Sequence, residues 1–235
     1  MADTAAELRL ESARLVVRAM RHDDVEEMDS WRPFTDPLCS LWNIPRRTSV
    51  GRDIWFVMHG SDPTRMWFAI ERRADGRVIG TVSLREIVEH ISARLGISLG
   101  ADYVEQGYGS EALRTFLPHY FRSLSFQRLF LDVAAANVRA IHVYQKLGFL
   151  QTASHYRNIP DGTDPRFLNQ APYRELRPYF RRRFGRTQLL FLDMALERRD
   201  WERPLAPNQP QTEMPLLEKE KAKDRVMVGL PPPLE

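Results

Sequence analysis

Cysteine is almost absent from this sequence, since Cys39 is the only one among 235 residues. One thiol excludes a disulfide within the chain and a thiolate metal cluster, and it fits a reducing compartment. Six histidines are present without the spacing of metal ligands, so we expect no metal site. No run of about eighteen apolar residues occurs, and the first fifteen residues include acids and no apolar core. These absences predict a cytoplasmic protein without a membrane span or a secretory signal.

Lysine is also scarce, because Lys146 is the only one before the C-terminal tail. Arginine is used instead and gathers in one segment. Between Arg166 and Arg186 there are seven arginines against Glu175 alone, a local charge of +6 (seven minus one) that exceeds the net +3 of the whole chain. Such a cluster is more often a solvated face than a binding site, although it could favour RNA or ribosomes.

The hydrophobic pattern predicts strands and helices in a definite order. The expected strands are residues 14–20, 66–73, 77–87, 91–100, 128–135, 149–156 and 187–198, and the expected helices are 23–31, 109–123 and 138–147. Asp75-Gly76 predicts a hairpin turn, and Pro118 should kink or end its helix. Residues 36–51 have the character of a loop, and 52–59 fit a short helix or a strand. Three antiparallel strands followed by strand, helix, strand and helix predict an α+β protein with a mixed, mostly antiparallel sheet.

The composition divides the chain into three parts. We expect an N-terminal extension at 1–12, one domain at 13–201, and a proline-rich tail at 202–235 that is extended or disordered, or that docks as an arm. Seven of the sixteen prolines lie between Pro204 and Pro233. Within the domain, 158–186 is an arginine-rich insertion with a short helix near 173–184.

A glycine turn at residues 106–110, QGYGS, opens an amphipathic helix. The first N–H groups of a helix lack intrahelical partners and lie at the positive end of its dipole, so this turn suits a phosphate or pyrophosphate. The same residues fit the G-x-G-x-x-A pattern of dinucleotide-binding oxidoreductases, with Asp132 as the ribose-binding acid. The polar segment 101–106 and the single strand–helix–strand unit argue against that alternative.

Three stretches resemble the GCN5-related N-acetyltransferase (GNAT) superfamily, over roughly residues 12–200. RLVVRAMRHDDVEEM is similar to its opening strand and helix, GADYVEQGYGSEAL to its pyrophosphate turn, and ANVRAIHVYQKLGF to its closing helix. The opening strand, the GADY lead-in and the Ser-Glu-Ala after the turn resemble the Rim-type branch, which acetylates ribosomal-protein N-termini and contains relatives with other amine substrates. One position departs from the pattern, because Val104 stands where the family usually has glutamine or arginine.

The resemblance implies the GNAT fold, in which helices flank a sheet splayed at its middle. It also implies acetyl-CoA as co-substrate, held without a metal. The strand before the turn and the strand after the helix would separate, and the pantetheine arm would enter the gap. The implied cofactor-binding residues are Ile97, Ser98, Leu99, Gln106, Gly107, Tyr108, Gly109, Ser110, Asn137 and Lys146.

The implied reaction moves an acetyl group directly to a primary amine, which loses a proton while the leaving thiolate gains one. By resemblance, Tyr144 is the general acid that protonates the CoA sulfur. Asp132 is the leading candidate for the base, acting through water, and Glu86 is the second. Each has a simpler alternative: Tyr144 could be a core residue on an apolar stripe, Asn137 only a helix cap, and Asp132 a strand end without a role.

The acceptor stays open. A protein N-terminus, a polyamine, an aminoglycoside, an amino acid or another small amine all fit, and the resemblance implies that residues 23–59 and 158–186 build the pocket. Trp31, Trp42, Trp55 and Trp67 could line that pocket or lie in the core. The resemblance also implies a frequent homodimer and permits contact with the ribosome. A third alternative is a non-catalytic basic module that binds RNA or ribosomes, although no stacking motif or helix-turn-helix supports nucleic-acid binding.

Overall fold

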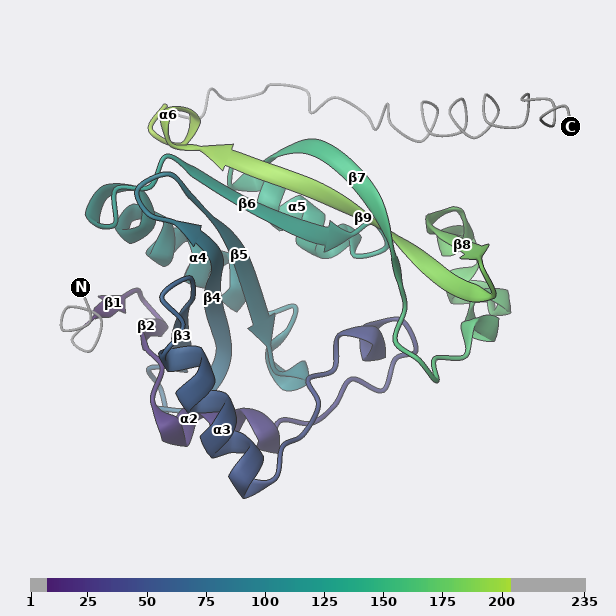
Figure 1. Ribbon diagram of the computed structural model, residues 1–235, viewed down its shortest axis with the longest axis horizontal. Helices are drawn as coiled ribbons and strands as arrows, with labels where there is room; N and C mark the ends of the chain where they lie inside the picture. The colour runs from purple at the N-terminus through teal and green to yellow at the C-terminus, as the bar shows by residue number, and fades with distance from the viewer. Residues whose placement is uncertain (1–7, 204–235) are drawn as a thin grey trace, which may run out of the picture. The chain divides into compact units, whose positions relative to one another are not determined.

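A computed structural model describes residues 8–203 of the chain (Figure 1). Most of the tail expected at 202–235 lies outside these residues, from 204 onward, as do residues 1–7 of the expected N-terminal extension. Within the described part, Arg9–Glu11 form strand β1, which pairs with Leu15–Ala19, strand β2. No helix among the described residues is long and apolar enough to cross a membrane.

The architecture is a nine-stranded sheet with the order β1-β2-β3-β4-β5-β6-β9-β7, and β8 pairs with β9. The further strands are β3 (Met66–Arg72), β4 (Val78–Val88), β5 (Ser92–Leu99), β6 (Arg128–Ala134), β7 (Leu150–Asn158), β8 (Phe180–Arg183) and β9 (Arg186–Glu197). Every neighbouring pair is antiparallel except β5 and β6. The sequence prediction of a mixed, mostly antiparallel sheet is confirmed.

The sheet splits at its middle. Strands β5 and β6 pair over three residues only, from Ser92 opposite Arg128 to Arg94 opposite Phe130. Beyond that point they separate, as Figure 1 shows. The rest of β5 stays bonded to β4 up to Leu99, whereas the rest of β6 stays bonded to β9. The splayed sheet that the resemblance implies is therefore present, and half of β5 has a free edge.

Helices cover both faces of the sheet. They are α2 (His22–Ser30), α3 (Ser49–Gly60), α4 (Tyr108–Pro118), α5 (Val138–Lys146) and α6 (Arg198–Trp201). Adjacent residues of a strand point to opposite faces. On β3, Trp67 packs against Trp55 of α3, and Phe68 packs against Phe116 of α4. Helices α3 and α4 therefore lie on opposite faces, and we call these the α3 face and the α4 face.

Helix α4 holds the glycine turn against the sheet. Its predicted apolar stripe is buried: Ala112, Leu113, Phe116, Leu117 and, just beyond, Tyr120 are all at most 2% exposed. Each large side chain contributes about 1.5–3 kcal/mol on burial. Pro118 ends the α-helical hydrogen bonding as expected, and the chain continues as a π-type turn at His119–Ser123.

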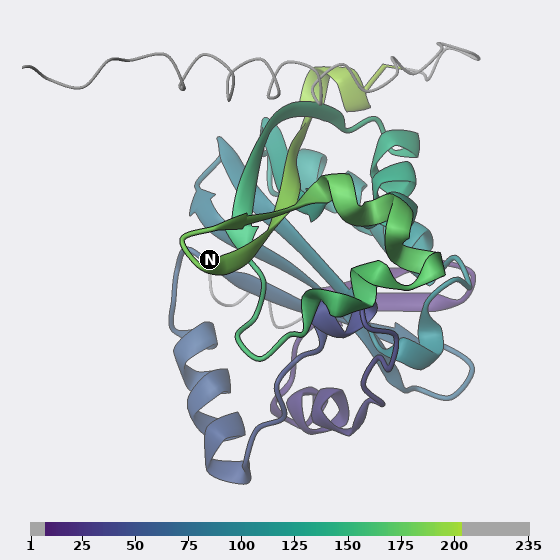
Figure 2. The ribbon, with the colours of Figure 1, turned by 90° about the vertical axis from the view of Figure 1, so that its right-hand side faces the viewer.

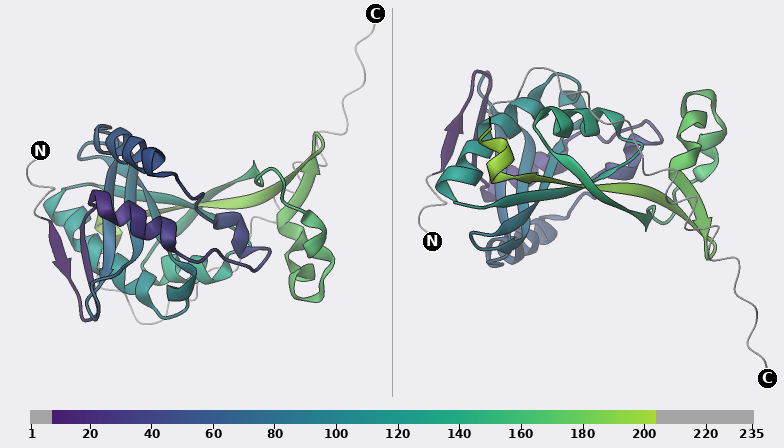
Figure 3. Two further views of the ribbon diagram at one scale, coloured as in Figure 1. Left: turned by 90° about the horizontal axis from the view of Figure 1, so that it is seen from below. Right: turned by 90° about the horizontal axis from the view of Figure 1, so that it is seen from above.

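Two segments differ from the sequence prediction. Residues 49–60 form helix α3 where we expected a loop up to 51 and an ambiguous element after it, because the continuous apolar run at 54–58 fits a strand as well as a helix. The apolar side chains Val50, Ile54, Val57 and Met58 of this helix face outward. The short helix expected near 173–184 is a 3-10 helix at Ala171–Tyr179 followed by strand β8, since Pro178 limits the helix and β9 offers a free edge. Figure 3 shows β8 beside the N-terminal end of β9.

Candidate active site

The glycine turn lies directly before α4 and has the backbone that only glycine adopts readily. Gly107 has φ +81° and precedes the first helical residue, Tyr108. A Cβ on Gly109 would lie 3.5 Å from Leu99 of β5, so the turn packs closely on the strand that loses its partner. The unpaired N–H groups at the start of α4 thus lie beside the free edge of β5, where an anion would meet the positive helix end.

A brace from the N-terminal segment fixes this turn. The Glu111 carboxylate accepts hydrogen bonds from Ser12 Oγ (2.8 Å) and the Arg14 backbone N–H (2.9 Å), and Arg14 Nη2 lies 2.7 Å from Oε2. Burial opposes ionisation of Glu111, but these bonds lower its pKa overall. The Arg14 guanidinium also donates to the Gln106 carbonyl (3.1 Å) and covers the Tyr108 ring. No local pattern predicts this brace, because its partners lie almost a hundred residues apart in the chain.

A cavity of about 1100 Å³ occupies the gap between β5 and β6. Its walls include ten of the predicted site residues: Ile97, Ser98, Leu99, Gly107, Tyr108, Gly109, Ser110, Asp132, Asn137 and Tyr144. They come from β5, the glycine turn, β6 and the N-terminal part and inner face of α5. One cavity thus joins the expected anion-binding turn to the expected general acid.

Three predicted residues are not part of this cavity. Glu86 is exposed on β4 and pairs with Arg94 at 2.8 Å. The Gln106 side chain turns back to donate to the Asp102 carbonyl (2.7 Å). Lys146 lines a separate groove of about 800 Å³ on the outer side of the turn. That groove is basic, being lined by Arg14, Arg114, Arg139, His142 and Lys146 against Glu111.

Tyr144 is buried at 9% exposure and contacts the Phe149 ring while lining the cavity. Burial, with the nearby Asp132 carboxylate as a second cause, raises the pKa of the Tyr144 phenol well above its usual range. Its hydroxyl group therefore stays protonated at neutral pH. Tyr144 can be both a core residue and a general acid, because its side chain is packed and still faces the cavity.

Asp132 is held between two guanidinium groups. Arg94 Nη1 lies 2.8 Å from Oδ1, and Arg157 Nη1 lies 2.7 Å from Oδ2. The Asp132 side chain is 9% exposed. Both carboxylate oxygens are thus engaged, which leaves few lone pairs for a proton acceptor. Asn137 caps α5 by accepting from the Ala140 N–H (3.2 Å) and also lines the cavity.

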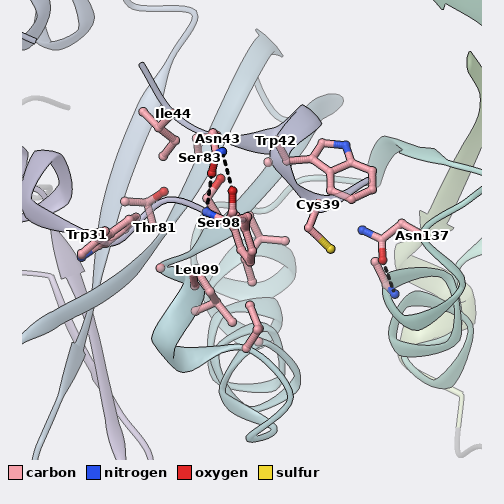
Figure 4. Close-up of a pocket in the computed structure, with 18 of the residues that line it drawn as sticks. Trp31, Cys39, Trp42, Asn43, Ile44, Thr81, Ser83, Ser98, Leu99 and Asn137 are labelled. Carbon is pink, nitrogen blue, oxygen red and sulfur yellow. Dashed lines mark hydrogen bonds between the residues drawn. The ribbon is translucent and has the colours of Figure 1, made fainter. Parts of the chain in front are cut away.

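The loop after α2 closes the cavity on the side opposite α5. The Asn43 side chain holds this loop by accepting from the Phe34 N–H (2.7 Å) and donating to the Phe34 carbonyl (3.0 Å). Figure 4 shows Cys39 and Trp42 of this loop facing Asn137 across the cavity. Burial, with the Asp36 carboxylate as a second cause, raises the pKa of the Cys39 thiol to about 11, so the thiol is neutral and a poor nucleophile.

The arginine-rich insertion supports that loop from behind. Tyr173 donates a hydrogen bond to the Asp36 carboxylate, and Leu38 joins an apolar cluster with Phe167 and Leu189. Figure 2 shows the segment between β7 and β9 beside this loop. Residues 23–59 line the cavity as expected, whereas no residue of 158–186 does so.

Of the four tryptophans proposed for the pocket, Trp31, Trp42 and Trp67 line the cavity, while Trp55 packs behind Trp67. The sequence prediction missed Thr81, Ser83 and Arg85 of β4 and His59 of α3, which also line it. The alternation Thr81, Ser83, Arg85 was the available signal, since polar side chains recur on one face of an otherwise buried strand.

The known proteins that this chain resembles are acetyltransferases. A sequence profile described as the acetyltransferase (GNAT) domain matches residues 14–150. The spermidine N(1)-acetyltransferase of Vibrio cholerae is 23% identical over 141 residues, which cover 60% of this chain and 81% of the relative. The spermidine N(1)-acetyltransferase of Escherichia coli (strain K12) is 34% identical over 92 residues, which cover 39% of this chain and 48% of that relative.

Solved structures share the fold. The Vibrio cholerae spermidine N-acetyltransferase in complex with CoA and spermine has a TM-score of 0.62 at 19% identity, covering 82% of this chain and 100% of its own. A GNAT-family acetyltransferase from Bacillus anthracis has a TM-score of 0.57 at 13% identity, covering 82% of this chain and 99% of its own. At these identities the likeness shows the shared architecture.

Proposed function

The chain belongs to the acetyltransferase (GNAT) family, and from this premise we propose that it moves the acetyl group of acetyl-CoA to the primary amine of a small molecule. The Vibrio cholerae and Escherichia coli relatives named above are small-molecule N-acetyltransferases by their names, which supports this class of acceptor. We treat the ribosomal-protein substrates of the Rim-type branch as the competing acceptor class.

One observation carries the proposal. Strands β5 and β6 stop pairing after Arg94 and Phe130, and the cavity in the gap has the glycine turn at one end and Tyr144 in its wall. A linear donor with a pyrophosphate at one end fits this shape. The start of α4 would hold the pyrophosphate. The free edge at Ile97, Ser98 and Leu99 would bond the amide groups of the pantetheine arm.

The basic groove outside the turn supports the same donor. Acetyl-CoA carries a further phosphate on its ribose. Lys146, Arg14 and Arg114 lie in the groove next to Gly107, where such a phosphate would find positive charge. This assigns Lys146 to the nucleotide end of the donor.

The chemistry is direct transfer. A neutral amine attacks the thioester carbonyl carbon, the C–N bond forms, the C–S bond breaks, and the thiolate takes a proton while the ammonium product loses one. We assign the proton donor to Tyr144, whose raised pKa keeps it protonated. An acetylated-enzyme route through Cys39 is disfavoured, because its pKa of about 11 leaves little thiolate.

Two candidates for the proton acceptor follow from the geometry. Asp132 could act through a bridging water, as the sequence predicts, although both its oxygens already bind arginines. His59 is the second: its Nδ1 lies 2.7 Å from the Trp55 carbonyl, which can only accept, so Nδ1 carries the proton and Nε2 keeps a lone pair. If His59 is the base, His59→Gln lowers kcat much more than Asp132→Asn does.

The experiment that tests the function has two stages. Isothermal titration with acetyl-CoA should show binding in the micromolar range, and a panel of amines should release free CoA. The panel includes polyamines, aminoglycosides, amino acids and ribosomal-protein N-terminal peptides. Absence of binding at millimolar acetyl-CoA would remove the proposal, and release only with peptides would move it to the protein-acetylating class.

A further inference from the structure

The α3 face of the cavity carries a hydrogen-bonding surface that the donor does not explain. Trp67 of β3 lies opposite Ser83 of β4, and Ser83 lies opposite Gly96 of β5. Arg85 follows two residues after Ser83 and points to the same face, because its Nη2 lies 3.9 Å from where a Gly96 Cβ would be. The Arg85 guanidinium thus reaches back over β5 toward the point where the strands separate.

Arg85 lacks the partner that its neighbours have. Arg94 lies opposite Arg85 across the strands and binds both Glu86 and Asp132 at 2.8 Å. Arg65, near the start of β3, binds Asp62 at 2.8 Å. Within residues 8–203, Arg85 forms no ion pair, although it is only partly exposed. Like charges in opposite positions are unfavourable, so the site gains from a bound anion at Arg85.

A second donor without a partner lies close by. Trp67 Nε1 is buried and has no hydrogen-bond acceptor among the described residues. An indole N–H can only donate, and leaving it buried without an acceptor costs about 1–3 kcal/mol. Trp67 and Arg85 are diagonal neighbours on β3 and β4, with Cα atoms roughly 7–8 Å apart. A carboxylate in the cavity can reach the Arg85 guanidinium, whereas Trp67 Nε1 stays covered by protein and contributes the apolar face of its ring to the wall.

The acids of the cavity are already neutralised. Each of its three carboxylates is paired with arginine: Asp29 with Arg47, Glu105 with Arg139, and Asp132 with Arg94 and Arg157. The walls also carry five arginines, of which Arg32, Arg65 and Arg139 are paired with Asp102, Asp62 and Glu105, whereas Arg46 and Arg85 form no ion pair among the described residues. A polycation such as spermidine would therefore meet no free carboxylate in these walls and excess positive charge.

We propose that the acceptor is an amine that also carries a carboxylate, and that Arg85 binds this carboxylate. The inference rests on the proposed acetyl transfer and narrows its substrate class. Gly96 and Ser98 lie two residues apart on β5, roughly 7 Å, which places the amine near the free edge and the carboxylate over Gly96. An amino acid or a molecule of similar size spans this distance. The spermidine-acetylating relatives would then differ from this chain in the sign of the charge that they select.

The test compares amines that differ only in the carboxylate. Lysine is paired with 1,5-diaminopentane, phenylalanine with phenethylamine, and 4-aminobutanoate with propylamine; spermidine is added, and CoA release gives kcat/KM for each. We expect the carboxylated member of at least one pair to be preferred about tenfold or more. Arg85→Gln should reduce its kcat/KM about 10- to 100-fold and the preference with it.

The controls separate the ways in which the proposal can fail. Arg85→Lys should recover part of the loss, and Arg128→Gln, which removes a guanidinium of β6 outside the cavity, should leave the preference unchanged. Melting curves and acetyl-CoA titrations establish that each variant is folded and binds donor. A natural chain that prefers spermidine or 1,5-diaminopentane to every carboxylated amine, or an Arg85→Gln variant with an unchanged carboxylate preference, would overturn the inference while leaving acetyl transfer intact.

A second arm tests whether the carboxylate belongs to the donor instead. Succinyl-CoA replaces acetyl-CoA with the same acceptors. If Arg85 binds a carboxylate on the acyl group, succinyl-CoA is a better donor than acetyl-CoA for the natural chain. Arg85→Gln then abolishes this advantage and leaves the preference among acceptors unchanged. This result would overturn the assignment of the carboxylate to the acceptor. Absence of both donor binding and transfer would instead count against the proposed function.

Discussion

The two sides of the cavity are built in different ways. The donor side comes from one stretch, residues 95–149, and offers mainly backbone groups: the turn at Gly107, the start of α4 and the free edge of β5. The acceptor side is assembled from the loop after α2, helix α3 and the α3 face of β3 and β4, and it offers side chains. The donor side can serve any acyl transfer of this type, whereas the acceptor side distinguishes one substrate from another.

The largest expected effect concerns Tyr144, where the two sides meet. Tyr144→Phe removes the proposed proton donor but keeps the ring in its packing with Phe149. Because general acid catalysis contributes about 10²–10⁴-fold, kcat should fall about 100-fold or more. The Kd for acetyl-CoA should stay within about threefold, since the donor side is intact. Stopped-flow release of CoA and titration calorimetry measure the two quantities.

Tyr120→Phe is the matched control for this change. Tyr120 is also buried, but its hydroxyl group donates to the Arg128 carbonyl at 2.7 Å and lies outside the cavity. The variant should lose about 1 kcal/mol of unfolding free energy and keep its turnover. Equal kcat in Tyr144→Phe and the natural chain would remove Tyr144 from the acid role.

The next effect tests the donor side alone. Gly107→Val places a β-branched residue at φ +81°, where it is strained, and the turn must shift away from the pyrophosphate. The Kd for acetyl-CoA should rise about 10- to 100-fold. Gly76→Val is the control, because Gly76 has φ +71° in a hairpin turn with open space around it. It should lose similar stability and bind acetyl-CoA normally; weakened binding there too would mean that global strain is responsible.

A smaller effect tests the acceptor side alone. Tyr173→Phe removes the hydrogen bond to Asp36 that anchors the loop after α2. The KM for the acceptor should rise about fivefold, with the Kd for acetyl-CoA unchanged. Tyr179→Phe, in the same 3-10 helix but without a hydroxyl hydrogen bond among the described residues, should behave like the natural chain. A change in donor affinity in Tyr173→Phe would show that the two sides are not separable.

The same anchor should respond to acid. Burial opposes ionisation of Asp36, but hydrogen bonds from Tyr173 and Cys39 lower its pKa overall. A lowered folded-state pKa contributes stability above the ordinary value near 4, and this stability is lost as the pH falls through the lowered pKa. The difference in unfolding free energy between the natural chain and Tyr173→Phe should therefore be constant near neutral pH and shrink below about pH 4. A difference that does not depend on pH would contradict the ionised anchor.

The smallest effect concerns the loop that faces the donor side. Because the pKa of Cys39 is raised to about 11, iodoacetamide should alkylate it slowly at pH 8, with a rate that keeps rising toward pH 11. Mass spectrometry after timed quenching measures this rate, and circular dichroism establishes that the protein is folded at each pH. A rate that levels off below pH 9 would mean that the loop does not enclose Cys39.

The comparison also explains what the sequence could predict. The strands, the glycine turn and the closing helix follow from local periodicity, capping and turn residues, so the sheet and the place of Tyr144 were accessible. Helix α3 was not, because the continuous apolar run at 54–58 fits a strand as well as a helix. Arg85 and Trp67 gain their meaning only from neighbours across the strands, and Arg14 from Glu111. Long-range pairing of this kind leaves no trace in a local pattern.

The short contact between β5 and β6 has a mechanical consequence. The two halves of the sheet are joined at one end by three residue pairs, from Ser92–Arg128 to Arg94–Phe130. A small rotation about this joint changes the separation near Arg94 little and the separation near Leu99 most. A donor bound in the cavity would contact both halves of the sheet, and its binding would therefore restrict this rotation.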